Sequence, residues 1–238
     1  RGGSRYVHDD LAVGDLLSIS TPRNNFAMAP AQQVFFIAGG IGITPIMTMI
    51  DSAERLGLDW QLLYGGRTRG SMAFTEELSR YGERVTICPQ DEAGLLDLTH
   101  LQEPIEHAQV YCCGPGPLLA AVEAAASAWP AGAVRFERFT AAQQPPPART
   151  LPFVVELARR GTCVTVTPQQ SILDALATVD VSVLTSCREG VCGTCEVGVL
   201  DGVPDHRDSL LTDDERTAND RMFVCVSRSV TDRLVLDL

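Results

Sequence analysis

The sequence predicts an α/β domain built on a doubly wound parallel sheet, followed by a smaller α+β domain. Three observations lead to this prediction. Apolar runs alternate with helix-length segments up to residue 139, a proline-rich stretch occupies 140–150, and the pattern beyond 150 changes to alternating strands with one helix. Strands that alternate with helices of this length favour a parallel sheet with helices on both faces.

The first 30 residues are too few for a domain of their own. The stretch HDDLAVGDLLSIST at 8–21 predicts a turn followed by a strand, as in the last strands of an antiparallel β unit. The chain does not begin with Met. We therefore expect it to be a piece of a longer protein in which this β unit is larger.

The first full domain is expected over 31–139. Its opening run, QVFFIAG at 33–39, predicts a fully buried strand. A helix at 44–57 follows, with Thr44 as its N-cap, Pro45 at its first position and Gly57 at its end. The remaining strands and helices alternate along the chain, at 59–66, 73–82, 84–89, 108–114 and 117–129.

A stiff linker is expected at 140–150, because three consecutive prolines favour an extended chain. The second domain then covers 151–238. Its first segment alternates and turns at Arg160–Gly161, which predicts a β-hairpin. A helix, a cysteine-rich loop and three strands complete it, the helix at 171–179 and the strands at 195–202, 221–228 and 233–238.

Composition narrows the functional classes. The net charge of −11 argues against a nucleic-acid partner, because phosphate binding needs a basic surface. The most apolar uncharged stretch, 34–50, contains four Gly or Pro residues and is too short for a membrane span. The eight cysteines cluster by motif and not as a disulfide framework, which favours a reducing, cytoplasmic location.

Three cysteines lie within nine residues. Cys187, Cys192 and Cys195 have the spacing C-x4-C-x2-C, and Cys225 follows in an expected strand. This is the spacing of plant-type [2Fe–2S] sites, in which four thiolates complete the tetrahedral shells of two irons. Zinc sites favour paired C-x2-C motifs, and a redox thiol pair would lack the third cysteine. The spacing therefore favours an iron–sulfur cluster over a zinc site, a redox pair or chance.

Two glycine-rich turns each follow an expected strand and open a helix. The first, AGGIGITP, supplies Gly39, Gly40, Gly42 and Thr44; the second, YCCGPGPLL, supplies Cys113, Gly114 and Pro115. One such turn alone is weak evidence for anything beyond a strand-to-helix connection. Two of them at the carboxyl ends of parallel strands predict a crevice for a dinucleotide.

Coenzyme choice depends on the stretch after the second strand, YGGRTRGS at 64–71. An acidic residue at this place would favour NADH by binding the ribose 2′-hydroxyl. Arg67, Thr68, Arg69 and Ser71 instead offer donors for a 2′-phosphate. The sequence favours NADPH over NADH, with solvated loop arginines as the alternative interpretation.

The motifs together resemble a known family. CREGVCGTC with MFVCVSR is similar to plant-type ferredoxins, which have a β-grasp fold, and covers 151–238. GGIGITP with CCGPGPLL resembles the nucleotide domain of the ferredoxin–NADP reductase superfamily. The order of the parts matches phthalate dioxygenase reductase-like proteins, including the reductase module of self-sufficient haem-thiolate monooxygenases.

The resemblance implies roles for individual residues. Cys113 would lie beside the nicotinamide ring, Thr44 near both flavin and nucleotide, and Phe139 over the flavin ring. The opening residues would bind the FMN phosphate, namely Arg1, Gly2, Gly3 and Ser4. Segment 1–30 would be the C-terminal remnant of an FMN-binding barrel whose preceding part, with its flavin motif, is missing from this chain.

The resemblance also implies a function. Electrons would pass from NAD(P)H through FMN to a [2Fe–2S] cluster and on to an oxygenase, most directly a fused haem-thiolate monooxygenase. An alternative is a separate-chain reductase of a non-haem ring-hydroxylating or demethylating oxygenase. A hypothesis of a different class is a ferredoxin-type electron carrier whose nucleotide domain is inactive.

Overall fold

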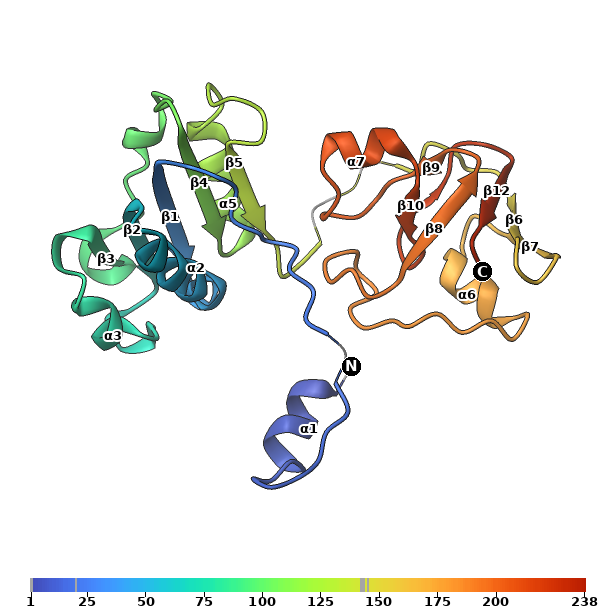
Figure 1. The fold of residues 1–238 in the computed structure, drawn as a ribbon, viewed down its shortest axis with the longest axis horizontal. Helices are drawn as coiled ribbons and strands as arrows, with labels where there is room; N and C mark the ends of the chain where they lie inside the picture. The colour runs from blue at the N-terminus through green and yellow to red at the C-terminus, as the bar shows by residue number, and fades with distance from the viewer. Residues whose placement is uncertain (1, 20, 142–143, 145) are drawn as a thin grey trace. The chain divides into compact units, whose positions relative to one another are not determined.

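A computed structural model describes residues 2–19, 21–141, 144 and 146–238 and divides the chain into two compact units (Figure 1). One unit is Phe26–Thr140, and the other combines residues 1–25 with 141–238. Among the described residues, no helix has the length and apolar character needed to cross a membrane.

The unit Phe26–Thr140 is built on five parallel strands in the order β3-β2-β1-β4-β5 (Figure 1). The strands are β1 (Gln33–Gly39), β2 (Asp59–Gly66), β3 (Val85–Pro89), β4 (Ala108–Cys113) and β5 (Val134–Glu137). From β1, the chain adds β2 and then β3 on one side of the sheet. It then returns and adds β4 and β5 on the other side of β1. This reversal is the switch point at which open α/β sheets bind ligands.

Helices cover both faces of this sheet, as the sequence predicts. Val34 and Phe36 belong to the core formed with α2 (Ile43–Leu56), whereas Phe35 and Ile37 belong to the core formed with α5 (Gly116–Ala125). Side chains of a strand alternate between faces, so β1 is apolar throughout because both faces are buried. Shorter helices connect the strands: α3 (Thr75–Ser79), α4 (Gln90–Ala93), and the 3-10 turns η1 (Gly40–Gly42), η2 (Arg69–Ser71), η3 (Gly82–Arg84) and η4 (Thr99–Leu101).

The start of α2 differs from the sequence prediction. Thr44 is not its N-cap, because η1 leads directly into α2 and the chain is already helical two residues earlier. The Thr44 hydroxyl donates to the carbonyl of Ile41 at 2.9 Å. The other end of the helix is as predicted, since Gly57 follows Leu56 with a φ of 65°, the left-handed conformation that glycine adopts readily.

Two further segments differ from the sequence analysis. No helix or strand is predicted for RFERF at 135–139, yet its first residues belong to β5, which pairs with β4. The strand expected within 8–21 does not form in the described residues. A helix, α1 (Gly3–Asp9), occupies the start, and the rest pairs with no described strand. A strand is stable only beside a partner that satisfies its backbone groups.

The second unit contains a mixed five-stranded sheet in the order β10-β8-β12-β6-β7. Its strands are β6 (Phe153–Leu157), β7 (Thr162–Val166), β8 (Glu196–Asp201), β10 (Arg221–Phe223) and β12 (Arg233–Leu236), with a small pair formed by β9 (Pro204–Asp205) and β11 (Arg228–Ser229). The predicted hairpin is β6–β7, and Gly161 turns it with a φ of 63°. Helix α6 (Ile172–Ala177) packs on the core through Ile172 and Leu176.

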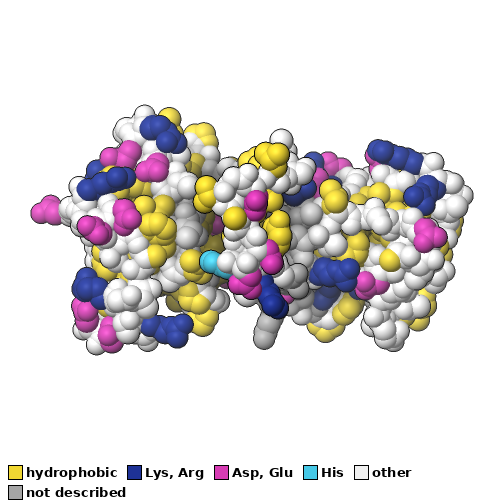
Figure 2. Space-filling view, turned by 90° about the horizontal axis from the view of Figure 1, so that it is seen from below, with side chains coloured by type: hydrophobic (Ala, Val, Ile, Leu, Met, Phe, Trp, Pro, Cys, Tyr) yellow, Lys and Arg dark blue, Asp and Glu magenta, His cyan; other side chains and the backbone are white. Residues whose placement is uncertain are grey.

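Charges are mixed over the surface. On the face shown in Figure 2, arginine side chains are interspersed with acidic ones over both units. Many of these pair locally, for example Arg84 with Glu54 and Arg159 with Asp237. The excess negative charge is shared by both units, with 7 basic and 13 acidic residues in Phe26–Thr140 and 12 basic and 17 acidic residues in the rest of the chain.

We predict that Gly42→Ala destabilises the unit Phe26–Thr140 by about 1–3 kcal/mol, because a Cβ at this position would collide with the Cys113 carbonyl oxygen. The free energy of unfolding in urea, followed by tryptophan fluorescence, measures this unit alone, since both Trp60 and Trp129 lie in it. Gly70→Ala is the matched control, because nothing lies within 4 Å of a Cβ there. Equal stability of the two variants would contradict the prediction.

Candidate functional site

The two glycine turns predicted from the sequence lie against each other at the switch point. A Cβ on Gly42 would meet the Cys113 carbonyl, and one on Gly39 would lie 2.7 Å from the Pro115 ring. A Cβ on Gly114 would lie 3.1 Å from the Gly39 Cα. Only glycine permits such close approach of two backbones. The carboxyl ends of β1 and β4 thus lie next to each other, and a helix begins after each of them.

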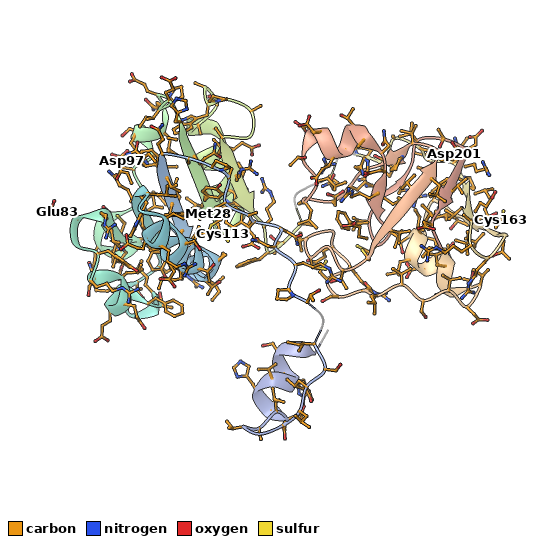
Figure 3. All side chains as sticks on the ribbon, viewed as in Figure 1. Met28, Glu83, Asp97, Cys113, Cys163 and Asp201 are labelled. Carbon is orange, nitrogen blue, oxygen red and sulfur yellow. The ribbon has the colours of Figure 1, made fainter. Side chains whose placement is uncertain are left out.

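Cys113 ends β4 at this edge and is fully buried (Figure 3). Burial, followed by the nearby Glu137 carboxylate, raises the pKa of Cys113 to about 12. The thiol is therefore neutral at pH 7 and can contribute shape and polarity, not a thiolate nucleophile. Cys112 is also fully buried, and it packs in the core on the α5 side of the sheet.

Glu137 is a site residue that sequence reasoning missed. It is the register partner of Cys113 on β5, and its Oε2 atom is buried with no hydrogen-bond partner among the described residues. Burial raises the pKa of this carboxyl above its ordinary value. The signal was present in RFERF, where an acid stands between aromatic residues at the end of a strand. A buried titratable group at a switch point is a functional candidate.

The residues expected to choose the coenzyme lie between β2 and α3. Thr68 and Ser71 form a capping box around η2, in which the Ser71 hydroxyl donates to the Thr68 carbonyl at 2.8 Å. Arg69 donates through Nη2 to Glu92 at 2.7 Å. The side chain of Arg67 makes no hydrogen bond or ion pair with any described residue. Of the four expected donors, Arg67 is thus the one with an unengaged side chain.

The residues expected at the flavin lie in separate units. Phe139 follows β5 and its side chain is 45% exposed, so an aromatic face is available there. Gly2 has a φ of 100° and precedes α1, in which Gly3 and Ser4 form the first turn. The residues expected to bind the FMN phosphate therefore form the start of a short helix. Arg1 lies outside the described residues.

The four predicted cluster ligands all lie in one unit and associate in two pairs. The Cys225 thiol donates a hydrogen bond to Cys195, which lowers the pKa of Cys195 and raises that of Cys225. Cys187 also donates a hydrogen bond to the sulfur of Cys192. No group of three or more His, Cys, Asp or Glu in the described ranges is arranged to hold one metal ion. Two separate thiol pairs fit a two-iron cluster, in which each iron takes two thiolates and two sulfides.

Positive φ angles shape the cysteine loop. Gly190 and Gly193 have φ of 70° and 73°, and Arg188 has 58°. The Gly190 N–H donates to the Cys225 sulfur, and the Glu189 N–H donates to the Cys187 sulfur at 3.3 Å. Backbone N–H groups directed at sulfur stabilise negative charge at a cluster. Cys225 lies in the turn after β10, not within a strand as predicted, and this turn brings its sulfur to the loop.

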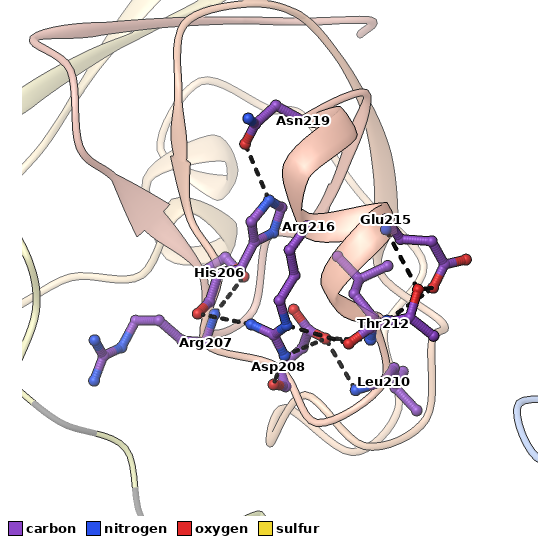
Figure 4. A network of polar contacts seen from close by, with 10 residues as sticks. His206, Arg207, Asp208, Leu210, Thr212, Glu215, Arg216 and Asn219 are labelled. Atoms are coloured by element: carbon purple, nitrogen blue, oxygen red, sulfur yellow. Dashed lines mark hydrogen bonds and ion pairs between the residues drawn. The ribbon is translucent and has the colours of Figure 1, made fainter. Parts of the chain in front are cut away.

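A buried carboxylate, that of Asp208, lies in the segment that is hydrogen-bonded to the cysteine loop, and Figure 4 shows its polar contacts. Asp208 is 2% exposed, and its Oδ2 accepts hydrogen bonds from the backbone N–H groups of Leu210 and Leu211. Arg216 of α7 (Asp213–Ala218) donates to the Asp208 carbonyl at 2.7 Å. The Ser209 N–H then donates to the Gly190 carbonyl at 2.9 Å. The cysteine loop is therefore fixed to a rigid neighbouring segment.

Comparisons with known protein families match both units. Residues 36–124 match the oxidoreductase NAD-binding domain, and residues 155–230 match the 2Fe-2S iron-sulfur cluster binding domain. The first range contains both glycine turns, and the second contains all four cysteines of the loop and its partner turn.

Several relatives are similar to this chain over its whole length. A putative toluene-4-sulfonate monooxygenase system reductase subunit of Comamonas testosteroni is 44% identical over 100% of this chain and 76% of its own length. The structure of phthalate dioxygenase reductase has a TM-score of 0.63 at 36% identity and covers 100% of this chain and 75% of its own.

An intact type IV self-sufficient cytochrome P450 monooxygenase has a TM-score of 0.91 at 43% identity, over 100% of this chain. This chain spans 32% of that structure. The similarity therefore holds for that part of the P450 protein and not for the rest of it.

We predict that Glu137→Gln stabilises the unit Phe26–Thr140 more at pH 7 than at pH 4. The folded pKa of Glu137 is raised, so the folded state binds more protons than the unfolded state above about pH 4.5, and its stability falls as pH rises through the folded pKa. A glutamine side chain does not titrate, so the Glu137→Gln variant avoids this loss of stability. Urea unfolding followed by tryptophan fluorescence at both pH values measures the difference.

Glu83→Gln is the control, because Glu83 is an exposed glutamate beside the amino end of β3 (Figure 3). A stability difference between Glu137→Gln and the unmutated chain that is the same at pH 4 and pH 7 would refute the assignment.

Proposed function

The chain belongs to the family of oxygenase-system reductases, electron-transfer proteins that join an NAD-binding domain to a 2Fe-2S domain, and we propose that it passes electrons from NADPH through FMN to a [2Fe–2S] cluster and on to an oxygenase. The proposed domains are 31–139 for the coenzyme and 151–238 for the cluster, with a linker at 140–150 and a flavin-barrel remnant at 1–30.

One observation carries the proposal: a glycine-lined switch point and a loop with two thiol pairs occur in one chain. The first suits a two-electron hydride donor, and the second suits a one-electron acceptor. Bound FMN would supply the exchange between two-electron and one-electron transfer. The exposed ring of Phe139 is the group on this chain that we propose to cover it, with Gly2, Gly3 and Ser4 at its phosphate.

The side chains at the switch point bind and orient the coenzyme. Gly40 and Gly42 let the pyrophosphate approach the backbone at the start of α2. Cys113, as a neutral thiol, and Thr44 lie at the edge where we propose that the nicotinamide enters. Glu137 places a carboxyl group next to Cys113, where it can accept a hydrogen bond from the carboxamide. We propose no general base or nucleophile, because hydride transfer needs orientation and exclusion of water.

The acceptor proposed here is a haem-thiolate monooxygenase fused to this chain, on the strength of the match to the self-sufficient P450 structure. The alternative is an oxygenase in a separate chain, which the similarity to reductase subunits supports. Reducing conditions, as in the cytoplasm, suit a chain whose eight cysteines form no disulfide bond.

An anaerobic visible spectrum tests the proposal against the electron-carrier hypothesis. We expect NADPH to bleach the flavin and cluster bands together in the protein loaded with FMN and iron–sulfur cluster. Bleaching of the cluster by dithionite alone, with no response to NADPH, would instead establish a ferredoxin-type carrier with an inactive nucleotide domain.

We predict that Cys225→Ser lowers bound iron by roughly tenfold or more, because one iron loses a thiolate and its pair with Cys195. Iron analysis and the visible charge-transfer bands of the purified protein measure this change. The control is Cys163→Ser, since Cys163 is exposed on β7 (Figure 3) and lies outside the cysteine loop. If both variants keep the same iron content, Cys225 is not a ligand.

We predict that the unmutated protein has a much lower kcat/KM with NADH than with NADPH, and that Arg67→Ala removes this preference. Arg67 has the unengaged guanidinium at the end of β2, where a 2′-phosphate would be bound. Steady-state kinetics with both coenzymes measure the ratio. Equal use of the two coenzymes by the unmutated protein would end the NADPH assignment.

A further inference from the structure

The loop after β2 is joined to the helix after β3 by a contact that the sequence does not reveal. Arg69 donates through Nε to Glu92 Oε1 at 3.2 Å and through Nη2 to Glu92 Oε2 at 2.7 Å. The two parallel hydrogen bonds form a bidentate, charge-assisted pair. Beside it, the Asp91 N–H donates to the Arg67 carbonyl at 3.2 Å. Helix α4 is thus held against the loop that carries the expected coenzyme-selecting arginines.

The pair can open without a large loss of stability. The side chains of Arg69 and Glu92 are 57% and 49% exposed, so both are hydrated whether or not they are joined. Ion pairs of this kind contribute little to folding. A ligand with a stronger negative charge can therefore displace Glu92 from Arg69 while the fold is kept.

The two coenzymes meet this pair differently. A 2′-phosphate carries close to two negative charges and needs the guanidinium that Glu92 already occupies; it is also repelled by the Glu92 carboxylate. A ribose 2′-hydroxyl is a donor, and a carboxylate at this edge of the sheet can accept from it. The Arg69–Glu92 contact therefore weakens the binding of NADPH and does not weaken the binding of NADH.

We propose that Glu92 is a specificity-determining residue, which lowers the preference for NADPH over NADH by holding the Arg69 guanidinium. Arg67 attracts the 2′-phosphate directly, and Arg69 contributes only after Glu92 releases it. This inference rests on the coenzyme site proposed above, and it predicts that the natural selectivity is weaker than two arginines alone would give.

The test uses binding of coenzyme fragments, which does not depend on flavin or cluster. Isothermal titration of the whole 238-residue chain with 2′,5′-ADP and with 5′-AMP gives the contribution of the 2′-phosphate as a ratio of Kd values. We expect Glu92→Gln to tighten 2′,5′-ADP by roughly three- to tenfold, because it frees one guanidinium and removes one repelling charge. Binding of 5′-AMP should change less than about twofold.

Two further variants isolate the cause. In an Arg69→Ala background, Glu92→Gln should lose most of its effect, because the arginine that it frees is gone. Glu83→Gln removes the same charge at the far end of β3 and should leave both Kd values unchanged.

The results distinguish a failure of the inference about Glu92 from a failure of the proposed coenzyme site. If Arg67→Ala weakens 2′,5′-ADP but Glu92→Gln leaves the ratio unchanged, the coenzyme site stands and the role of Glu92 is overturned. If neither Arg67→Ala nor Arg69→Ala affects 2′,5′-ADP, the site itself is misplaced and the inference falls with it.

Discussion

Two backbone segments approach each other closely at the switch point of the parallel sheet, and the rest of the unit Phe26–Thr140 depends on this contact. Gly39 and Gly42 leave room for Cys113, Gly114 and Pro115 to pass at the distance of main-chain contact. Because of this, two strands end and two helices begin around one point. N–H groups that lack intrahelical partners are gathered there, which suits a phosphate-bearing ligand. The thiol of Cys113 and the carboxyl of Glu137 are placed by the same contact.

In the second unit, four thiols are brought together by a loop and a turn, and not by a helix or a sheet. Its loop is kept in shape by backbone conformations that most residues avoid, at Gly190 and Gly193, and by the buried Asp208 behind it. The paired arrangement of the sulfurs follows from this loop and from the turn after β10. These constraints fix the positions of the ligands, and fewer conformations of the ligands lower the entropy lost on binding.

Much of this architecture could be predicted from the sequence, since buried strands, glycine turns and cysteine spacing are local patterns. Strands β1 and β2 have the predicted bounds, and both glycine turns lie where the alternation places them. The failures concern contacts between distant residues. Strand β5 needs β4 as a neighbour, and segment 8–21 has no described strand to pair with. Glu137 and Glu92 were not singled out in the sequence, and their importance follows from their structural neighbours Cys113 and Arg69.

The high pKa of Cys113 has a consequence for the durability of a protein that handles electrons in the presence of oxygen. Partly reduced oxygen species such as peroxide attack the thiolate form of cysteine and convert it to sulfenic and then sulfinic acid. Burial keeps Cys113 protonated near neutral pH, and the adjacent Cys112 is fully buried as well. A small, polarisable group can therefore remain at the carboxyl end of β4 over many turnovers without being consumed by oxidation.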